Sequence, residues 1–488
     1  MQRRDFMKIA TVGGLTATAA LSTVPINLSS HQRRNVLFIA VDDLKPLIGA
    51  FGATQVHTPH IDRLSKRGII FKNNHCQQAI CGPSRTSLMT GLRPDTTRVW
   101  DLKTTMRSIL PDVVTLPQYF MNHGYITRAT GKIYDGRCVD NGRGWVSQDI
   151  PSWSQPARKV NGTRYALPKI KSNPKPATEC SDMPDKLYKD YHCATNGIEI
   201  MNECSVTTSP WFLGVGFNLP HLPFSVPKKY WDLYDREMIK INPIQQRPKG
   251  TPFFVWQNSW ELRRYSDIPD NGPIPTKLQR KLIHGYLASV SFIDEQVGRL
   301  IDHLESLGQT ENTVICLWGD HGWHLGDHGM FCKHTNYEQA TRSPLILVAP
   351  DIIPAGTSTN APTEFVDIYP TLCDLTGLEP HPQLEGTSLL PIIENPTSSV
   401  KLVSISQYPR RYNKQDVMGY AYRDHRYRYV EWIQKRFRQG EKTGPIILQE
   451  LYDYDKDPFE RTNLANDRSY TNRLARLVDI AHTIRKRD

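Results

Sequence analysis

The sequence predicts an α/β protein organised around one large β-sheet. Three continuous apolar runs, at residues 35–41, 211–217 and 313–318, have the pattern of strands that are buried on both faces. Residues 276–307 have apolar side chains at helical spacing and are followed by Gly308, which predicts a long helix that covers the sheet. With 488 residues, 39% of them hydrophobic, the chain is long enough for one large core and a smaller second domain.

The first predicted strand ends in two adjacent carboxylates, Asp42 and Asp43. Ligands of open α/β sheets bind at the carboxyl ends of the strands, and carboxylates are the ligands that hard cations prefer. An aspartate directly after a strand is also common as a helix cap or in a turn. The residues alone leave both interpretations open.

Residues 81–91 predict a short helix with a nucleophile at its start. Ser84 is a suitable N-cap and Gly91 a suitable residue just past the end, so Cys81 is expected immediately before the helix. The positive end of the helix and the planar fork of Arg85 favour an anionic ester as the substrate. The alternative is a small buried thiol beside a surface helix.

The chain between residues 58 and 196 predicts short elements and then long loops. Residues 58–68 and 115–123 predict helices, and residues 125–129 predict a strand followed by Lys132. A lysine at a strand end can meet an anion, although most such lysines are solvated. Residues 139–196 are rich in Gly, Pro, Ser, Asn and Lys, which predicts long loops that either recognise the substrate or form a passive insertion.

A histidine follows the second buried strand. His221 lies between prolines directly after residues 211–217, so we expect it at a rigid turn near the end of that strand. Histidine titrates near neutral pH and suits acid–base work. A lone histidine is more often structural, and the residue type alone does not decide.

The third buried strand ends in a second ligand cluster, Gly319-Asp320-His321-Gly322. His321, His324 and His328 lie close together in the sequence, which makes zinc an alternative metal. We prefer calcium because the other candidate ligands are carboxylates. On this interpretation His324 and His328 only orient loops.

The sequence pattern of the chain changes near Pro380. Residues 343–350 predict a further strand and residues 364–375 a covering helix, whereas residues 418–432, beyond about Pro380, are strand-like. Three arginines here are candidates to reach the substrate cleft, although exposed arginines are usually solvated: Arg410, Arg411 and Arg423.

The N-terminal residues predict export. Arg3 and Arg4 stand before a mildly apolar stretch, and residues 1–30 resemble a bacterial twin-arginine signal, so we expect the mature protein in the periplasm or secreted. A frayed basic terminus is the alternative. No uninterrupted apolar run of about 18 residues or more occurs, so no stable membrane insertion is expected.

The formal net charge of +11 indicates an anionic partner. Polyanionic carbohydrate, nucleic acid and anionic membrane surfaces all suit this charge. No basic tail, zinc-finger spacing or RNA-binding signature is visible, so nucleic acid is not the expected partner.

The nine cysteines are an odd number, so at least one cannot form an intrachain disulfide. Cys81 is our candidate for the unpaired one. Cys180 and Cys193 flank a polar loop and are predicted to be able to bridge in an oxidising compartment. Cys316 lies in a predicted strand and is expected in the core.

The segment around Cys81 resembles a known signature. Residues 81–91 match C-x-P-S-R-x-x-L-x-T-G position for position, the signature of the type I sulfatases, whose cysteine is oxidised to formylglycine. Four further blocks are similar to the family: Gly131-Lys132, the P-H-x-P-F motif at His221, the D-H-G-x-x-L-G-x-H-G block with Lys333 beyond it, and the ending at Leu451 to Leu464. The resemblance spans about residues 35–465. It looks most like the iduronate-2-sulfatase branch, which also holds bacterial enzymes acting on marine algal polysaccharides.

The resemblance implies a fold and a domain plan. The fold would be alkaline-phosphatase-like, with a large mixed β-sheet sandwiched by helices and a smaller C-terminal antiparallel sheet. Residues 1–30 would be the export signal, residues 31–380 the catalytic domain, and residues 381–488 a C-terminal α+β subdomain.

The resemblance also implies a site. One calcium ion would be held by Asp42, Asp43, Cys81, Asp320 and His321. The catalytic residues would be Cys81, as the formylglycine nucleophile, with Arg85, Lys132, His221 and Lys333. The three cations would neutralise the sulfate oxygens, and the histidine would bind sulfate or protonate the leaving oxygen. A formylglycine-generating enzyme would be the maturation partner.

One position departs from the family pattern. Shortly after the Gly-Lys pair the family usually has a histidine, whereas this chain has Asp135. A carboxylate beside a sulfate would be repulsive, so we expect Asp135 either to turn away or to bind a sugar hydroxyl.

Three functions follow from these observations. The first is a sulfatase acting on a sulfated carbohydrate, either a glycan that contains uronic acid or a marine algal polysaccharide. The second is a phosphoester or phosphonate hydrolase of the same superfamily. The third is a non-catalytic protein that binds polyanions. The matched site residues favour the first.

Overall fold

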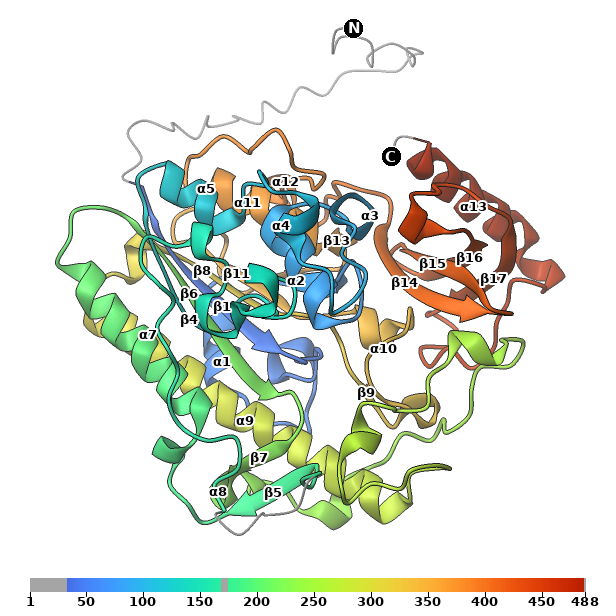
Figure 1. Cartoon of the computed structure of the whole chain (residues 1–488), viewed down its shortest axis with the longest axis horizontal. Helices are drawn as coiled ribbons and strands as arrows, with labels where there is room; N and C mark the ends of the chain where they lie inside the picture. The colour runs from blue at the N-terminus through green and yellow to red at the C-terminus, as the bar shows by residue number, and fades with distance from the viewer. Residues whose placement is uncertain (1–32, 168–173, 487–488) are drawn as a thin grey trace, which may run out of the picture. The chain divides into compact units, whose positions relative to one another are not determined.

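The structure, a computed structural model, describes residues 33–167 and 174–486 and is built around a seven-stranded sheet (Figure 1). The strand order is β12-β2-β11-β8-β1-β6-β4. The strands are β1 (Asn35–Asp42), β2 (Ile69–Phe71), β4 (Ile126–Gly131), β6 (Trp211–Pro220), β8 (Thr313–Gly319), β11 (Leu345–Val348) and β12 (Thr357–Thr359). The predicted export signal at residues 1–30 lies outside the described residues.

The sheet is mixed, and β1 is an interior strand next to the central strand β8. Strand β1 pairs in parallel with β6 on one side and with β8 on the other, so the carboxyl ends of all three meet at one edge. Strand β11 runs antiparallel to both β8 and β2. The three predicted buried strands therefore deliver their terminal polar residues to one place.

Helices cover both faces of the sheet. Leu37 and Ile39 of β1 pack with residues of α1, α7 and α9, whereas Val36 and Phe38 pack with residues of α2, α5 and α11. The two groups lie on opposite sides of the sheet in Figure 1. Because side chains on both faces of these strands are buried, the strands have continuous apolar sequences. The helices are α1 (Pro59–Ser65), α2 (Cys81–Thr90), α5 (Leu116–Asn122), α7 (Lys189–Ser205), α9 (Thr276–Ser306) and α11 (Ile368–Leu375).

A four-stranded antiparallel sheet follows near the C-terminus. It is formed by β14 (Ser404–Tyr412), β15 (Gln415–Arg423), β16 (Tyr427–Gln434) and β17 (Ile446–Asp453). Leu477 and Ala481 of α13 (Thr471–Arg485) pack into its apolar cluster. The strand-like region 418–432 is thus two strands, because Asp424 accepts bonds from the backbone N–H groups of Arg426 and Tyr427 in a tight turn between them.

The remaining elements are short. They are β3 (Asn74–His75), β5 (Thr178–Ser181), β7 (Phe224–Pro227), β9 (His324–Leu325), β10 (Phe331–Cys332), β13 (Thr363–Glu364), α3 (Pro94–Thr97), α4 (Met106–Ile109), α6 (Gly144–Ser147), α8 (Lys228–Trp231), α10 (Glu338–Thr341) and α12 (Leu390–Glu394). Twelve 3₁₀ segments of three residues each complete the described chain. The predicted loop region 139–196 mostly has this character, but α7 already begins within it at Lys189.

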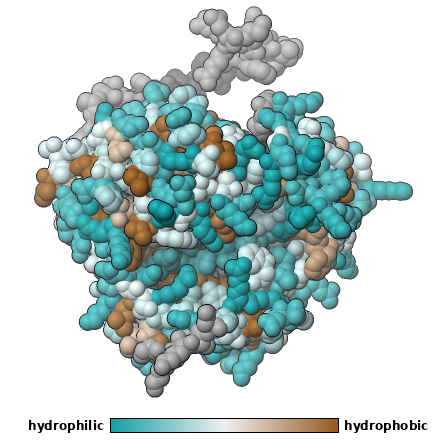
Figure 2. Space-filling model, in the orientation of Figure 1, coloured by the Kyte–Doolittle hydropathy of each residue, from teal (hydrophilic) through white to brown (hydrophobic). Residues whose placement is uncertain are grey.

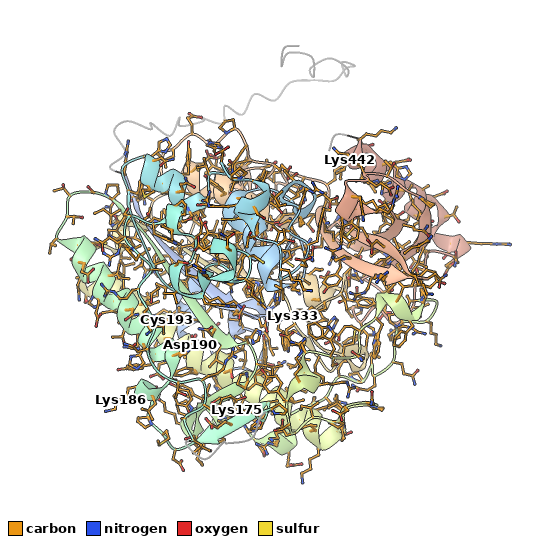
Figure 3. The ribbon with its side chains drawn as sticks, in the orientation of Figure 1. Lys175, Lys186, Asp190, Cys193, Lys333 and Lys442 are labelled. Atoms are coloured by element: carbon orange, nitrogen blue, oxygen red, sulfur yellow. The ribbon has the colours of Figure 1, made fainter. Side chains whose placement is uncertain are left out.

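Cys180 and Cys193, which we expected to be able to bridge, do not form a disulfide. All nine cysteines are free thiols. Cys180 is exposed on β5, whereas Cys193 is buried on α7, where Figure 3 labels it, and its thiol points to the carbonyl of Gly216 at 3.3 Å. Spacing around a polar loop could not show that Cys193 faces the sheet. Cys316 is buried in β8, as predicted.

The visible surface is mainly hydrophilic, with scattered hydrophobic side chains (Figure 2). Among the residues that the structure describes, no helix is long and apolar enough to cross a membrane.

Candidate active site

A buried cluster of metal-binding side chains lies where the central strands end. Asp42 is the last residue of β1 and Asp43 follows it, Asp320 and His321 follow β8, and Cys81 is the first residue of α2. One ligand atom from each of Asp43, Cys81, Asp320 and His321 lies within 4.8 Å of the others. The Cys81 Sγ is 3.4 Å from the His321 Nε2. The structure therefore brings four of the five predicted metal ligands into one group, and the fifth, Asp42, forms a second group with Cys81 and His221.

The backbone at the end of β1 is held in an unusual conformation. Asp43 has a φ of 61°, a left-handed value that aspartate tolerates better than most residues. Its N–H donates to the Asp320 Oδ1 at 2.9 Å, and the Tyr286 hydroxyl of α9 donates to its carbonyl at 2.9 Å. Residues in such conformations cluster at functional sites, where surrounding bonds hold them.

Helix α2 begins four residues earlier than predicted. Ile80 is the N-cap and Cys81 the first helical residue, because the first helical hydrogen bond runs from the Ser84 N–H to the Ile80 carbonyl. Pro83 lies inside this first turn, where its missing N–H costs nothing. The Ser84 hydroxyl donates instead to the Asp320 carbonyl and ties the helix to the end of β8. The predicted stop at Gly91 is correct.

Arg85 lies behind the site rather than in the pocket. Its side chain is fully buried, with its Nε 2.9 Å from the Asp320 Oδ2 and its Nη2 3.1 Å from the Asp42 Oδ1. Its Nη1 donates to the carbonyls of Lys132 and Ile133. We expected its fork to bind sulfate oxygens, but its donors are used to orient carboxylates.

Two lysines reach the same carboxylates from other directions. The Lys132 Nζ is 2.5 Å from the Asp42 Oδ2, and the Lys333 Nζ is 3.0 Å from the Asp43 Oδ1. Both line a pocket of about 260 Å³ together with Cys81. Gly131, with a φ of 76°, makes the turn that places Lys132 there, and a Cβ at this glycine would lie 2.0 Å from the Gly216 carbonyl oxygen.

His221 and a glutamate complete the pocket. The His221 Nε2 is 3.2 Å from the Glu261 Oε1, which is itself 2.9 Å from the Lys333 Nζ. Burial opposes ionisation, but Lys333 and His221 outweigh it and hold the pKa of Glu261 well below its usual range. Sequence reasoning missed Glu261 because it lies in an irregular segment without periodicity or a recognised motif.

The adjacent aspartates differ in their electrostatics. Burial raises the pKa of Asp43, and the neighbouring Asp42 adds to that effect despite Lys333. Burial acts on Asp42 too, but Lys132 and Arg85 hold its pKa well below the usual range. A site that must keep both carboxylates ionised therefore gains from a further positive charge.

Asp135 turns away from the pocket and binds an arginine. Its oxygens accept from the Arg137 Nε at 2.9 Å and the Arg137 Nη2 at 2.7 Å. Arg137 lies over Trp145 and lines the 260 Å³ pocket. Of the two arrangements that we expected for Asp135, the structure shows the one in which its carboxylate turns away.

The three C-terminal arginines do not line this pocket. Arg423 is buried and pairs with Glu338 at 2.9 Å, and Arg410 donates to the carbonyls of Phe254 and His334. Arg411 is exposed on β14. The arginines in the lining come from loops of the main domain instead: Arg137, Arg164 and Arg264.

The two other histidines after β8, His324 and His328, lie outside the group of metal-binding side chains. The His324 Nε2 is 2.8 Å from the Thr335 hydroxyl, and the His328 Nδ1 is 3.0 Å from the Gln246 carbonyl. Neither belongs to a candidate metal group in the described part of the chain. The loop-orienting role of these two histidines stays a prediction.

Comparison with known proteins places this geometry in a family. The sulfatase family model matches residues 34–378, most of the chain. The chain belongs to the sulfatase family. A model described as the C-terminal part of N-sulphoglucosamine sulphohydrolase also matches residues 326–487. The predicted enzyme class, a sulfuric ester hydrolase, and the predicted alkaline-phosphatase-like fold are both confirmed.

Relatives of this sulfatase are similar along nearly their whole length. Iduronate 2-sulfatase from Homo sapiens is 32% identical, covering 92% of this chain and 95% of that protein. A sulfatase from Formosa agariphila is 31% identical, covering 91% and 86%. A solved structure of a protein in complex with its substrate D-glucosamine-2-N,6-O-disulfate has a TM-score of 0.72 at 21% identity, covering 93% of this chain and 98% of that one.

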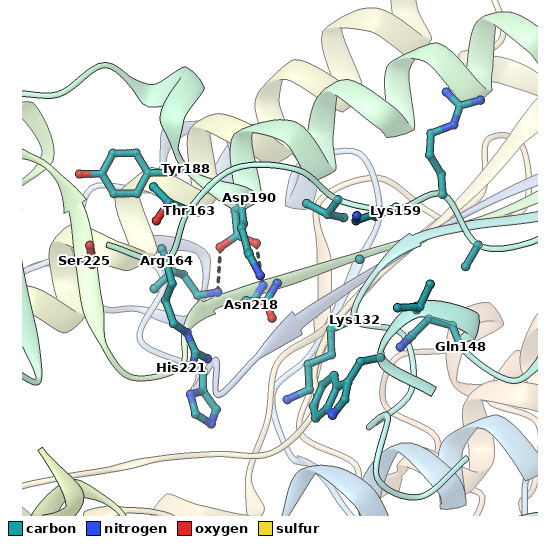
Figure 4. Close-up of a pocket in the computed structure, with 18 of the residues that line it drawn as sticks. Lys132, Gln148, Lys159, Thr163, Arg164, Tyr188, Asp190, Asn218, His221 and Ser225 are labelled. Atoms are coloured by element: carbon teal, nitrogen blue, oxygen red, sulfur yellow. Dashed lines mark hydrogen bonds between the residues drawn. The ribbon is translucent and has the colours of Figure 1, made fainter. Parts of the chain in front are cut away.

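Asp190 anchors the turn that precedes His221 in this sulfatase. Its carboxylate accepts from the backbone N–H groups of Asn218 at 2.7 Å and Leu219 at 3.1 Å, the bonds dashed in Figure 4. Burial nevertheless raises its pKa to about 6. The folded state therefore binds a proton more tightly than the unfolded chain, whose aspartate titrates near 3.8.

We expect the stability of the protein to fall as the pH rises through this interval. The contribution of Asp190 is fully present below about pH 4 and is lost as the pH passes 6, by up to about 3 kcal/mol. Asp190→Asn keeps an acceptor but cannot ionise. Urea unfolding of both proteins between pH 4 and 7 should give a difference that changes with pH, and a constant difference would contradict the assignment.

Proposed function

We propose that this protein is an exported sulfatase that hydrolyses sulfate esters of a sulfated carbohydrate through a formylglycine at position 81 and one calcium ion. The observation that carries the proposal is that Cys81 lies within 4.8 Å of ligand atoms of Asp43, Asp320 and His321 in one group and of Asp42 in another, beside a pocket that Lys132 and Lys333 also line. The sugar-sulfate substrates in the names of the relatives support the substrate class.

The donor set fits calcium. Asp42, Asp43 and Asp320 offer carboxylate oxygens, the ligands that hard cations prefer, and His321 and residue 81 complete the predicted set. The raised pKa of Asp43 supports the need for an additional cation among these carboxylates. When bound, calcium would supply positive charge that polarises the sulfate group.

The chemistry of Cys81 supports its conversion. Burial raises the pKa of its thiol well above the usual value, so the unmodified thiol is neutral and a weak nucleophile. Formylglycine would supply a hydrated aldehyde with two hydroxyls, one to attack sulfur and one to let sulfate leave. A formylglycine-generating enzyme is the proposed partner in maturation.

The other side chains have separable roles in this proposal. Lys132 and Lys333 would neutralise the negative charge on the sulfate oxygens, and His221 would protonate the leaving oxygen of the sugar. Arg85 would fix the orientation of Asp42 and Asp320 without touching the substrate. Glu261 would hold His221 and Lys333 in place, since one of its oxygens contacts both.

The test compares ester classes with converted protein. We would co-produce the chain with a formylglycine-generating enzyme and measure the anion released from sulfated mono- and oligosaccharides, a phosphate ester and a phosphonate monoester. The proposal predicts that free sulfate is released fastest. Faster release from the phosphonate with a transition metal bound would favour the hydrolase alternative, and glycan binding without any turnover would favour a binding protein.

We expect Lys333→Gln to lower kcat/KM for the sulfate ester by about 10²-fold to 10³-fold. The change removes one preformed positive charge from the pocket where charge develops in the transition state. Lys186→Gln is the matched control, because Lys186 is exposed and lines neither this pocket nor the larger cavity that adjoins it. Equal activity of the two variants would contradict the role of Lys333.

A further inference from the structure

A second cavity, of about 450 Å³, adjoins the reaction pocket (Figure 4). Its volume falls within the roughly 300–1,000 Å³ typical of small-molecule sites. Five residues line both spaces: Lys132, Trp145, Arg164, Asn218 and His221. A molecule that presents its sulfate ester to Cys81 can therefore extend directly into this cavity.

The cavity is strongly basic. Lys159, Arg164 and Lys189 line it and are exposed, and no ion pair with a carboxylate involves them in residues 33–167 and 174–486. Arg158 also lines it but is committed to Glu199 and Glu203. Unpaired cations gathered around one concavity raise the local concentration of anions.

Among the described residues, one acidic side chain lines the cavity, and it does not cancel this charge. Asp190 is buried, and both of its oxygens already accept backbone N–H groups at the start of the His221 turn. Burial raises its pKa to about 6, so part of its charge is removed in mildly acidic solution. The unpaired side chains that face the cavity are therefore mainly positive.

A tryptophan forms the wall between the two spaces. Trp145 is 50% exposed, and its ring lies 5.6 Å from the Lys132 Nζ. An exposed tryptophan offers a flat apolar face with a polar edge, which suits a ring-shaped ligand with apolar and polar faces. Asn218, Thr163 and Ser225 add neutral polar groups around the cavity.

We propose that this cavity binds the sugar residue next to the one that carries the reacting sulfate, and that it selects a neighbour with an anionic group, either a carboxylate or a second sulfate. The proposal rests on the proposed function, and it adds that the preferred substrate is an oligosaccharide rather than a single sugar. Lys159, Arg164 and Lys189 would bind the anionic group. Trp145 would contact the face of a ring.

The experiment uses one sulfated sugar in four forms: alone, joined to a neutral hexose, joined to a hexuronic acid, and joined to a second sulfated sugar. We expect kcat/KM of the converted enzyme to be at least about tenfold higher for the two anionic disaccharides than for the single sugar and the neutral disaccharide. The two anionic disaccharides distinguish carboxylate from sulfate recognition.

The double variant Lys159→Gln/Lys189→Gln tests the cavity without touching the reaction pocket, which neither lysine lines. It should lose about tenfold on the anionic disaccharides and keep its activity on the single sugar. Lys186→Gln should change neither. An equal loss on all four substrates, or no loss on any, would overturn the proposal.

Binding to Cys81→Ala separates this proposal from the proposed function. Calorimetry with the same four compounds requires no turnover, so it reports on the cavity even if no sulfate is released. Tighter binding of the anionic disaccharides that disappears in the double lysine variant supports the cavity proposal. Equal binding of all four compounds overturns it, whatever the enzyme then hydrolyses.

Discussion

Cys81→Ala abolishes sulfate release, with a loss of at least about 10⁴-fold in kcat, if residue 81 carries the nucleophile. The side chain is buried at the first position of α2 and its Sγ contacts His321, so alanine removes the reactive group without altering a surface. The fold should survive, because the substitution deletes a single buried sulfur atom. Assay of free sulfate and thermal unfolding of the same sample measure both effects.

Cys138→Ala is the matched control for this change. Cys138 is also a buried free thiol, and it lies close to Gly82, the residue that follows Cys81. A Cβ placed on Gly82 would be 2.4 Å from the Cys138 Sγ. It does not belong to a candidate metal group in the described residues. We expect this variant to keep its activity. Retained activity in Cys81→Ala would contradict covalent catalysis at this position.

If the proposed calcium ion occupies the site, its removal is expected to stop turnover and to lower the melting temperature. A ligand present at about 100 times its dissociation constant adds about 2.7 kcal/mol to the stability, which for a protein of this length corresponds to about 3 °C. Chelation followed by addition of Ca²⁺, Mg²⁺ or Zn²⁺, one at a time, measures the effect by calorimetry and by sulfate assay. Restoration by Ca²⁺ is the expected result.

Asp320→Asn provides the control for the metal. The variant loses one carboxylate charge of the cluster and weakens the buried pair with Arg85, so its melting temperature should fall and should no longer respond to Ca²⁺. Asp367→Asn is a matched substitution at a buried carboxylate. Asp367 pairs with Lys401 and belongs to no candidate metal group in the described residues. This control should still respond to Ca²⁺. A full response to Zn²⁺ alone would support the zinc interpretation.

The central strands and the residues at their ends were predictable because burial on both faces leaves a continuous apolar pattern. The runs at residues 35–41, 211–217 and 313–318 all form strands of the main sheet. The parallel pairing of these strands then fixes where Asp42 and Asp320 meet. The rule that strand ends carry ligands needs no knowledge of side-chain direction.

Other features depend on tertiary contacts that no periodicity encodes. Glu261 and Arg164 reach the pocket from irregular segments, where neither spacing nor a motif indicates direction. The orientation of Arg85 is set by Asp42 and Asp320, which come from other parts of the chain. Asp135 forms an ion pair with Arg137, two residues later. The departure of residue 135 from the family pattern did not by itself indicate this pair.

The most direct test of the account is the relation between sulfate release and the fraction of residue 81 that is formylglycine. Preparations with different degrees of conversion, obtained by varying the amount of the co-produced maturation enzyme, would be analysed by peptide mass spectrometry and assayed on one sulfated sugar. The account predicts a rate proportional to the converted fraction and no sulfate release at zero conversion. Full activity in protein that retains the Cys81 thiol would contradict it.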